Sequence, residues 1–470
     1  MMNTHGAIKY TRTFFILIAM CVSMGTVVAQ GIDFRRFTLP CGVRVLLHSN
    51  PHAPVVSVGL MYRSGLNDQP SNLSGVNDVV ALLRMNTSRH LKDGEYADIM
   101  ETYGGNTSYS VGHDVTFFCD NFSSNMLKGA VWLAAEKTAE CMATPEEFDK
   151  YYTQVKRKLS GTIDEKTDID LLYDMVQTVN MRLVPQFMEY DEGLDLDVVH
   201  HYERAYFTPD KAVLTISGMI DVDSTARIVR EMFAFLPDTN YGEDVRPSFF
   251  TVNNAPKDSL KTREGNVIGV GDGILAMKDA SSRVDTIYRR AAQDAVIMAW
   301  QVPPYTDPQA EVFDFIGTVL AAQGGRLREV LMKESNMASS VEYLSLPMSR
   351  ASVFAIKVTA AEGIPLADIV QEVTTQIDLL KSRNISDTEL TQALNTSSMD
   401  MWQSISTNEG MVRYLASAEL MYGNASVMNS RLERMSRITA DELREVVQRF
   451  IRTDNMKTFY ILPTSAKDLK

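Results

Sequence analysis

The sequence has few of the residues that build metal centres and nucleic-acid interfaces. Its 470 residues include only 7 histidines and 4 cysteines, and no cluster of five or more basic residues occurs. The formal net charge is -13. This balance argues against nucleic acid as a main partner, because phosphate binding needs a basic face.

The cysteines are too few and too scattered to form a disulfide framework. Cys21 lies in the N-terminal apolar segment, which leaves Cys41, Cys119 and Cys141, an odd set without Cys-x-x-Cys spacing. Neither a disulfide framework nor a zinc site follows from such spacing. We expect buried free thiols.

Long apolar runs are also missing, except at the N-terminus. Lys9 and Arg12 precede an apolar stretch that is interrupted from Ser23 onward and ends in small residues up to Ala29. The run is shorter than the about 20 residues that a membrane span needs. The pattern predicts a signal peptide over 1–29, with an N-terminal anchor helix as the alternative. We therefore expect an exported protein, periplasmic or associated with the cell envelope, with no transmembrane segment after cleavage.

What the sequence does contain is typical of a large globular protein. Hydrophobic residues make up 45% and charged residues 22% of the chain. The length favours two to four domains, or two large ones.

Two pairs of similar segments indicate an internal duplication. Thr144 and Ser386 each begin a helix-start pattern and lie 242 residues apart (386 − 144). Asp210 and Asp454 each lie in a turn between an aromatic helix end and a β-rich run, 244 residues apart (454 − 210). Two pairs at nearly one offset predict a duplicated domain of about this size.

Within each half the pattern is mixed α and β. In the first half it predicts a strand, turn and strand over 35–48, a strand over 53–65, a helix over 94–105 and one long strand over 107–122. Blocks of strands followed by long helices favour an α+β sandwich with helices on one sheet face. The polar segment 238–265 suits a linker, and 273–295 is interpreted as an insertion.

The stretch 75–87, with the sequence GVNDVVALLRMNT, is predicted to be an amphipathic helix. Val76, Val79, Val80 and Leu83 recur at the i, i+3, i+4, i+7 spacing that places side chains on one face. The helix therefore has a structural reason to persist whatever its other positions carry.

Several segments, in this order, resemble the insulinase-like (M16, pitrilysin-type) metallopeptidases, in particular the short two-domain processing-peptidase branch. They are the strand pair at 37–65, the segment 100–116, the helix-to-strand segment 202–221 and the Gly-Gly helix at 324–343. The resemblance covers nearly all of 35–465. It implies an α+β fold of duplicated two-layer α/β-sandwich domains of the LuxS/MPP-like metallohydrolase type. The implied boundaries are an N-terminal domain over 30–237, a linker over 238–265 and a C-terminal domain over 266–470.

The family's inverted zinc motif, His-x-x-Glu-His, is degenerate in this chain. Two imidazoles four residues apart share a helix face and grip one ion, and the enclosed glutamate activates the bound water. Here Asp78 and Leu82 stand at the two histidine positions and Ala81 at the glutamate position. The third ligand would fall near Thr162. We therefore predict no catalytic residues and no metal ligands on this helix.

Asp78 has a structural explanation as well. It lies in the first helical turn after Ser74, a residue suited to capping, where a carboxylate interacts favourably with the helix dipole. We prefer this role to metal binding.

The resemblance implies a second missing feature. Non-zinc subunits of two-chain family members supply an Arg and a Tyr, seven residues apart in the second domain, to contact substrate. Met332 and Ser339 stand at these positions, and Arg328, one turn earlier, is out of register.

The family's substrate strand is also altered in this chain. The candidate peptide-binding strand is Ser108, Tyr109, Ser110 and Val111.

These observations favour a non-catalytic, pseudoprotease subunit that pairs with an active zinc-containing homologue to process peptides. The partner is that homologue in a heterodimer, or a second copy in a homodimer, and the ligand is a peptide or unfolded protein segment. No cofactor is expected in this chain, and zinc is expected only in the partner. The alternative is an envelope binding, scaffold or chaperone-like protein without a proteolytic partner. An active zinc metalloendopeptidase is the least favoured function, because both motif histidines and the base are missing.

Overall fold

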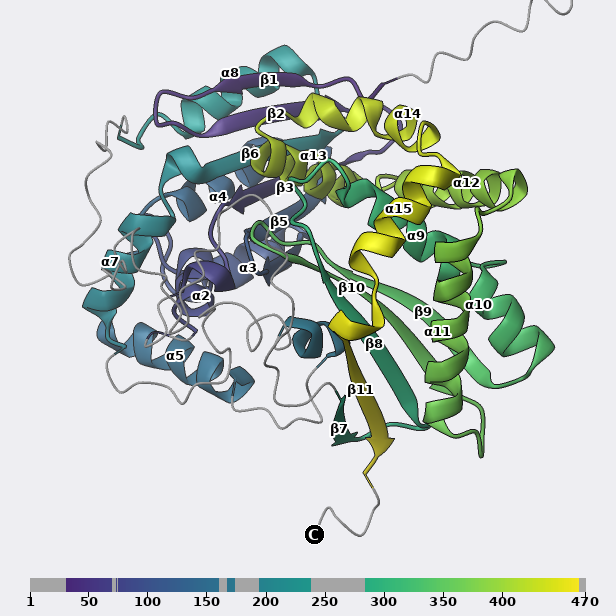
Figure 1. Cartoon of the computed structure of the whole chain (residues 1–470). Coiled ribbons are helices and arrows are strands. Elements are labelled where there is room, and N and C mark those ends of the chain that lie inside the picture. Colours follow the sequence, from purple (N-terminus) through teal and green to yellow (C-terminus); the bar gives the residue numbers. More distant parts are fainter. Residues whose placement is uncertain are drawn as a thin grey trace, which may run out of the picture. The chain divides into compact units, whose positions relative to one another are not determined.

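Two mixed β-sheets, each formed by one half of the chain, organise the fold (Figure 1). The computed structural model describes residues 31–69, 73, 75–159, 167–173, 194–237 and 284–464. Residues Phe34–Lys470 belong to one unit, and Met1–Asp33 to another. The predicted signal segment and the predicted linker 238–265 lie outside the described residues, so the domain boundaries stay a prediction.

The first sheet has six strands among the described residues, in the order β1-β2-β6-β3-β5-β4. The strands are β1 (Arg35–Thr38), β2 (Arg44–Ser49), β3 (Val55–Tyr62), β4 (Asn106–Val111), β5 (Thr116–Ser123) and β6 (Ala212–Gly218). The first two form the predicted strand-turn-strand unit. Its turn contains Gly42 at φ 94°, a left-handed conformation that glycine adopts without steric cost.

The second sheet repeats this topology without a counterpart of β1 in the described part of the chain. Its order is β7-β11-β8-β10-β9. The strands are β7 (Val284–Arg289), β8 (Ala295–Val302), β9 (Ala338–Leu346), β10 (Ser352–Ala360) and β11 (Met456–Pro463). The pair β2·β6 and its counterpart β7·β11 are parallel, and the other pairs, including β1·β2, are antiparallel. The predicted duplication and the α+β class are confirmed.

The strand β7 corrects one sequence interpretation. The segment 273–295 was interpreted as an insertion, but its described part, from Val284, pairs with β11 and completes the sheet. Polar residues interrupt the apolar residues of β7, whose burial pattern is that of a largely exposed edge strand, so the sequence shows no buried apolar run there.

The helices follow the same duplication. In the first half they are α2 (Val76–Asn86), α3 (Glu95–Thr102), α4 (Leu127–Thr138), α5 (Pro145–Leu159), α7 (Leu196–Tyr206) and α8 (Val222–Met232). In the second half they are α9 (Ala310–Ala321), α10 (Arg326–Arg328), α11 (Leu366–Ser382), α12 (Asp387–Ser404), α13 (Asn408–Tyr422), α14 (Arg431–Ser436) and α15 (Ala440–Phe450).

The two helix starts that revealed the repeat are both capping boxes. Thr144 exchanges hydrogen bonds with Glu147 at the start of α5. Ser386 and Glu389 do the same at the start of α12. Each box satisfies two backbone N–H groups that a helix start otherwise leaves without partners.

Helix α13, from the second half, covers one face of the first sheet (Figure 1). Side chains of β3 alternate between faces, so Val56, Val58 and Leu60 enter the core beneath α2 and α4, while Gly59 faces α13. A Cβ at Gly59 would lie 2.2 Å from Cγ1 of Val412. The absent side chain therefore lets the helix approach the strand.

The first half of the chain also covers part of the second sheet. Residues 167–173 of the first half pack Leu171, Leu172 and Tyr173 into a cluster with Ile297 and other side chains of the second sheet. Each sheet is thus covered on a second face by residues of the other half. The expectation of helices on only one sheet face is wrong, because the apolar runs of β3 and of β8 are buried on both sides.

The segment 107–122 also differs from the sequence prediction of one long strand. It forms a hairpin of β4 and β5, and the Gly112 N–H donates to the Val115 carbonyl at 2.8 Å to close the turn. Alternation continues through such a turn, so periodicity alone does not reveal it.

His113, at this hairpin tip, packs its ring on Tyr173 with centroids 3.9 Å apart. Burial lowers its pKa to about 4, and the Asp114 and Asp170 carboxylates only partly offset this. The unfolded chain takes up the proton near pH 6.5 and the folded chain near pH 4. Stability is therefore fully present above about pH 6.5 and falls between about pH 6.5 and 4, by about 3 kcal/mol for a shift of this size.

Urea unfolding of the wild type and His113→Gln across this pH range measures that effect. We expect a steep decline in the wild type and a flatter profile in the variant. Parallel profiles would show that His113 does not titrate in this way.

Other sequence predictions concern the thiols and the membrane. Cys41, Cys119 and Cys141 are buried and form no disulfide among the described residues, as predicted. Among the described residues, no helix is both long and apolar enough to cross a membrane.

Candidate functional site

The motif helix α2 is held in the core by its predicted apolar stripe. Val76, Val79, Val80 and Leu83 are all fully buried. The helix packs against α5 and α7 as well as the sheet layer. It is capped by Gly75, with φ 83°, while Ser74 lies outside the described residues.

The three motif positions on α2 carry no zinc chemistry. Ala81 and Leu82 are part of the hydrophobic core. Asp78 is also buried, and its Oδ1 accepts a 2.7 Å hydrogen bond from Nζ of Lys158 on α5. The position of the first ligand is thus filled by a carboxylate that an ammonium already neutralises.

Tyr109 of β4 belongs to the same electrostatic environment. Burial raises the pKa of its hydroxyl, Asp78 adds to the shift and Lys158 opposes it. Burial lowers the pKa of Lys158, but Asp78 outweighs this, so the net shift is upward. The ammonium therefore stays charged beside Asp78.

A zinc ion does not fit this donor set. Catalytic zinc takes three protein ligands, usually with imidazole among them. Among the three motif positions of α2, Asp78 alone offers a carboxylate, and it is paired with Lys158. The expected third-ligand position, Thr162, lies outside the described residues.

We predict that Asp78→Ala changes stability by only about 1 kcal/mol, because the Lys158 side chain is 62% exposed and regains water. Peptide binding and metal content should be unchanged. Chemical denaturation and metal analysis measure these quantities. Lys158→Met should cost more, since it leaves a buried carboxylate without its partner, and the reverse order would contradict the assignment.

The predicted peptide strand lies on β4, the last strand of the first sheet in the described part of the chain. Ser108 donates to Oε1 of Glu409 at 2.6 Å, and Arg413 donates to Ser110 at 3.3 Å. Both partners lie on α13. Successive side chains alternate, so Tyr109 lies on the opposite side, near Asp78. The second half of the chain thus orients the strand.

The candidate substrate-contacting positions of the second domain make their contacts within the second half of the chain. Met332 lies in the π-helix Glu329–Glu334 and packs against the core of the second half. Ser339 donates to Oε1 of Gln293 at 2.9 Å. Arg328 donates to the Val341 carbonyl at 3.0 Å, so it is turned toward the backbone of β9.

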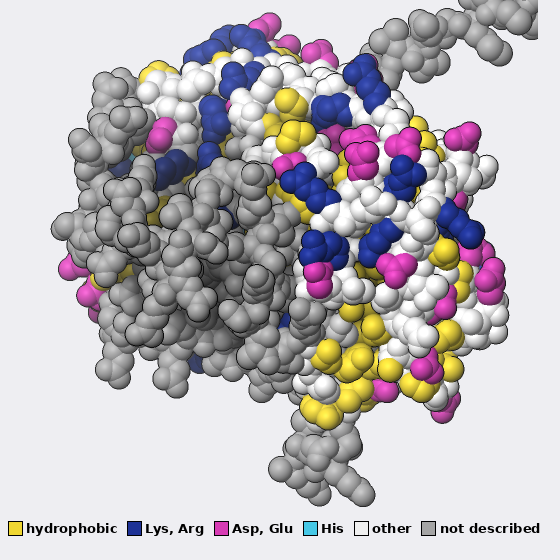
Figure 2. Space-filling view, in the orientation of Figure 1, with side chains coloured by type: hydrophobic (Ala, Val, Ile, Leu, Met, Phe, Trp, Pro, Cys, Tyr) yellow, Lys and Arg dark blue, Asp and Glu magenta, His cyan; other side chains and the backbone are white. Residues whose placement is uncertain are grey.

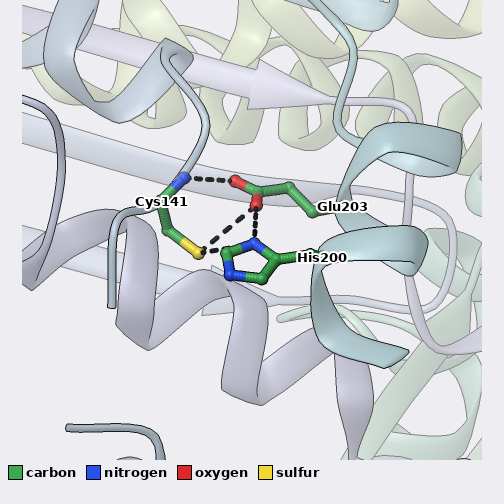
Figure 3. Close-up of side chains that lie close together, drawn as sticks. All are labelled: Cys141, His200 and Glu203. Carbon is green, nitrogen blue, oxygen red and sulfur yellow. Dashed lines mark hydrogen bonds and ion pairs between the residues drawn. The ribbon is translucent and has the colours of Figure 1, made fainter. Parts of the chain in front are cut away.

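A cluster that the sequence analysis did not identify lies elsewhere in the first half (Figure 3). Cys141, His200 and Glu203 are the one group of three His, Cys, Asp or Glu side chains among the described residues whose ligand atoms could hold a metal. Cys141 lies between α4 and α5, and the other two lie one turn apart on α7. The only sequence signal is His-x-x-Glu, and the distant cysteine could not be joined to it.

The buried carboxylate of Glu203 is the centre of this cluster. Its Oε1 accepts from Nε of Arg84 at 2.6 Å and from the Cys141 N–H at 2.9 Å. Its Oε2 accepts from the Cys141 thiol at 3.3 Å. Burial raises the pKa of Glu203, but Arg84 together with the hydrogen bonds from His200 and Cys141 outweighs it, and the net shift is downward. Burial raises the pKa of the Cys141 thiol.

The cluster is not a nucleophilic triad. In a triad the imidazole accepts the nucleophile's proton on one nitrogen and is oriented through the other. Here Nδ1 of His200 faces both Cys141 Sγ, at 3.8 Å, and Glu203 Oε2, at 3.5 Å. One nitrogen cannot serve both roles.

Comparison with known proteins agrees with the fold. Residues 44–183 match the profile described as "Insulinase (Peptidase family M16)", and residues 193–397 match "Peptidase M16 inactive domain". The duplicated sheets and these two matches define a peptidase-like α+β protein. The chain belongs to the insulinase family, M16.

Its curated relatives include zinc proteases and a processing-peptidase subunit. An uncharacterized zinc protease of Streptomyces coelicolor is 18% identical over 88% of this chain and 86% of that protein. The zinc protease PqqE of Helicobacter pylori is 19% identical over 72% of each. Mitochondrial-processing peptidase subunit alpha of Bos taurus is 28% identical over 39% of this chain and 36% of that protein.

Solved structures show the same fold. A protease from Helicobacter pylori superimposes with a TM-score of 0.74 at 16% identity, covering 92% of this chain and 100% of that one. A peptidase M16 inactive domain from Pseudomonas fluorescens gives 0.72 at 14% identity, covering 92% and 99%.

Proposed function

We propose that this protein is a non-catalytic member of the insulinase family that binds an extended peptide and pairs with a zinc-bearing homologue. One observation carries the proposal. The motif positions of α2 hold a neutralised carboxylate and two core side chains, Ala81 and Leu82, where the family chemistry needs two imidazoles and a base.

Peptide binding is supported by the edge position of β4. An edge strand presents unpaired N–H and C=O groups, to which an extended peptide adds as a further strand. Ser108 and Ser110 are engaged by α13, which holds the strand in place for such pairing. Tyr109 is 37% exposed and offers an aromatic surface to a bound segment.

The face shown in Figure 2 offers no surface of a single charge sign among the described residues. Lys/Arg and Asp/Glu side chains are intermixed on the non-grey part of the face in Figure 2. The net charge of -13 therefore contributes mainly to solubility.

Pairing with a homologue is supported by the kinds of relatives that the chain has. Some relatives are named as subunit alpha of the mitochondrial processing peptidase, and others are named zinc proteases. A chain without the zinc positions contributes to proteolysis only if another chain supplies them. The N-terminal segment supports export, so we place this pair in the periplasm or cell envelope.

Co-purification from the native cell tests the pairing. Recovery of an equimolar homologue that carries His-x-x-Glu-His supports the proposal. Recovery of an unrelated membrane complex would favour a scaffold role instead. Peptidase activity and stoichiometric zinc in the isolated chain, both lost in Asp78→Ala, would overturn it.

Proline substitutions at Ser108 and Tyr109 test the peptide strand. Successive N–H groups along a strand point to opposite edges, so one variant removes an outward donor and the other removes a bond to β5. We expect the variant that removes the outward N–H to lose peptide binding with little loss of stability. The variant that removes the bond to β5 should be destabilised. Fluorescence anisotropy of labelled peptides and thermal unfolding separate the two effects. Undiminished binding in whichever variant stays folded would exclude β4 as the binding edge.

A further inference from the structure

The atoms Sγ of Cys141, Nδ1 of His200 and Oε2 of Glu203 converge on one point in the first half of the protein (Figure 3). Their separations are 3.3 Å for Sγ···Oε2, 3.5 Å for Nδ1···Oε2 and 3.8 Å for Sγ···Nδ1. Tetrahedral zinc with bonds of about 2.0–2.3 Å separates its ligand atoms by about 3.3–3.6 Å. The triangle is close to one face of such a tetrahedron.

Hydrogen bonding alone accounts for this arrangement incompletely. The thiol has one proton, which it donates to Glu203. The 3.5 Å separation of His200 Nδ1 from Glu203 Oε2 is long for a hydrogen bond between nitrogen and oxygen. The 3.8 Å separation of Nδ1 from Cys141 Sγ is a weak contact to sulfur. The imidazole nitrogen thus faces both atoms without a short bond to either.

We propose that Cys141, His200 and Glu203 bind one zinc ion at a site separate from the degenerate motif on α2. The mixed sulfur, nitrogen and oxygen ligands suit zinc better than the hard cations Mg²⁺ and Ca²⁺, which prefer oxygen alone. Binding forms a zinc–thiolate bond and releases the thiol proton to solvent, so charge and atoms balance. The imidazole binds as the neutral form through Nδ1.

The surroundings of the site support metal binding. Oε1 of Glu203 is held by Arg84 and by the Cys141 N–H, which leaves Oε2 for the ion and fixes the carboxylate. Arg84 is anchored in turn by the carbonyls of Lys137 and Phe207.

Access to the site runs past His200, whose side chain is 21% exposed. Glu140, with Oε1 3.9 Å from the same Nδ1, is 47% exposed and lies at the opening. This carboxylate, or water, completes the fourth position.

The site's role follows from its elements. Cys141 belongs to the connection between α4 and α5, while His200 and Glu203 belong to α7, so one ion fastens these elements together beside the last turn of α2. The inferred zinc is structural. It requires no peptidase activity and stands independently of the proposed function.

Zinc titration of the purified, chelator-treated full chain tests the inference, with a chromophoric chelator as competitor. We expect one zinc per wild-type chain. Affinity should fall at least about ten-fold in His200→Gln and Cys141→Ser. The matched controls His201→Gln, the neighbouring histidine, and Cys119→Ser, another buried thiol, should bind like the wild type. Cobalt substitution should give a thiolate charge-transfer band that Cys141→Ser lacks.

Several outcomes would overturn the inference. They are the absence of stoichiometric zinc, equal affinity of His200→Gln and His201→Gln, or cobalt binding without the thiolate band. His200 is partly exposed, so its variant should fold even if Cys141→Ser does not. Zinc that persists in His200→Gln but is lost in Asp78→Ala would contradict the proposed function as well as this inference, whereas a lack of zinc in the wild type overturns the inference alone, which distinguishes the two failures.

Discussion

Replacing Asp120 by alanine is expected to destabilise the protein by about 3–5 kcal/mol. Asp120 forms a buried ion pair with Lys137, and both side chains are 2% exposed. Its other oxygen accepts from Tyr96 and from Thr107 of β4. Removing the carboxylate leaves the Lys137 ammonium in the core with the Tyr96 hydroxyl, 3.1 Å away, as its side-chain hydrogen-bond partner among the described residues. This pair lies directly behind the proposed peptide strand.

Two further variants separate charge from packing. Asp120→Ala combined with Lys137→Met should recover much of the loss, because no unpaired charge then remains in the core. Lys128→Met, which removes an ion pair with Glu231 that is about 60% exposed on both sides, should cost under about 1 kcal/mol. Urea unfolding followed by circular dichroism measures all three. A double variant less stable than Asp120→Ala would refute this account.

The double variant Arg36→Met/Arg44→Met is expected to lose about 3–5 kcal/mol and to loosen α13 from the first sheet. Both guanidinium groups, on β1 and β2, face the fully buried carboxylate of Glu419 on α13, at 2.8 and 3.5 Å. Without them the carboxylate keeps only the Ala425 N–H, at 3.1 Å. The ion pairs therefore hold an element of one half on the sheet of the other.

The reverse substitution should be milder. Glu419→Ala leaves arginine side chains that are 47% and 22% exposed and can regain water, so we expect a loss of about 1–3 kcal/mol. Arg35→Met, on the same strand as Arg36, removes only an exposed pair with Asp223 and should cost under about 1 kcal/mol. Hydrogen exchange of the α13 amides detects the loosening. Unchanged protection in the double variant would rule out the anchoring role.

Local sequence patterns were sufficient to predict helix α2 and the starts of α5 and α12. The stripe of Val76, Val79, Val80 and Leu83 predicted α2 because helical periodicity reports the buried face directly. The capping residues Thr144 and Ser386 predicted helix starts, because their hydroxyls bond backbone groups within three residues. Both signals are local, and both were confirmed.

Sequence patterns failed to predict the structure where the burial of a strand depends on residues far away in the sequence. The apolar run of β3 gave no warning that α13 covers its second face, since that helix lies some 350 residues later. In the edge strand β7, Asp285, Thr286 and Arg289 interrupt the apolar residues, so it was taken for an insertion. The turn within 107–122 was missed because alternation continues on both sides of it.

By itself, the sequence determined that neither an imidazole nor a glutamate stands at positions 78, 81 and 82 of the motif helix, because residue identity alone decides this. It also determined the duplication and the family resemblance, through segments whose order is fixed by the chain. Only the tertiary structure decided what replaces the metal. It pairs Asp78 with Lys158, 80 residues away, and brings Cys141 to His200 and Glu203. Contacts between distant residues depend on how helices pack, and local sequence patterns do not encode that packing.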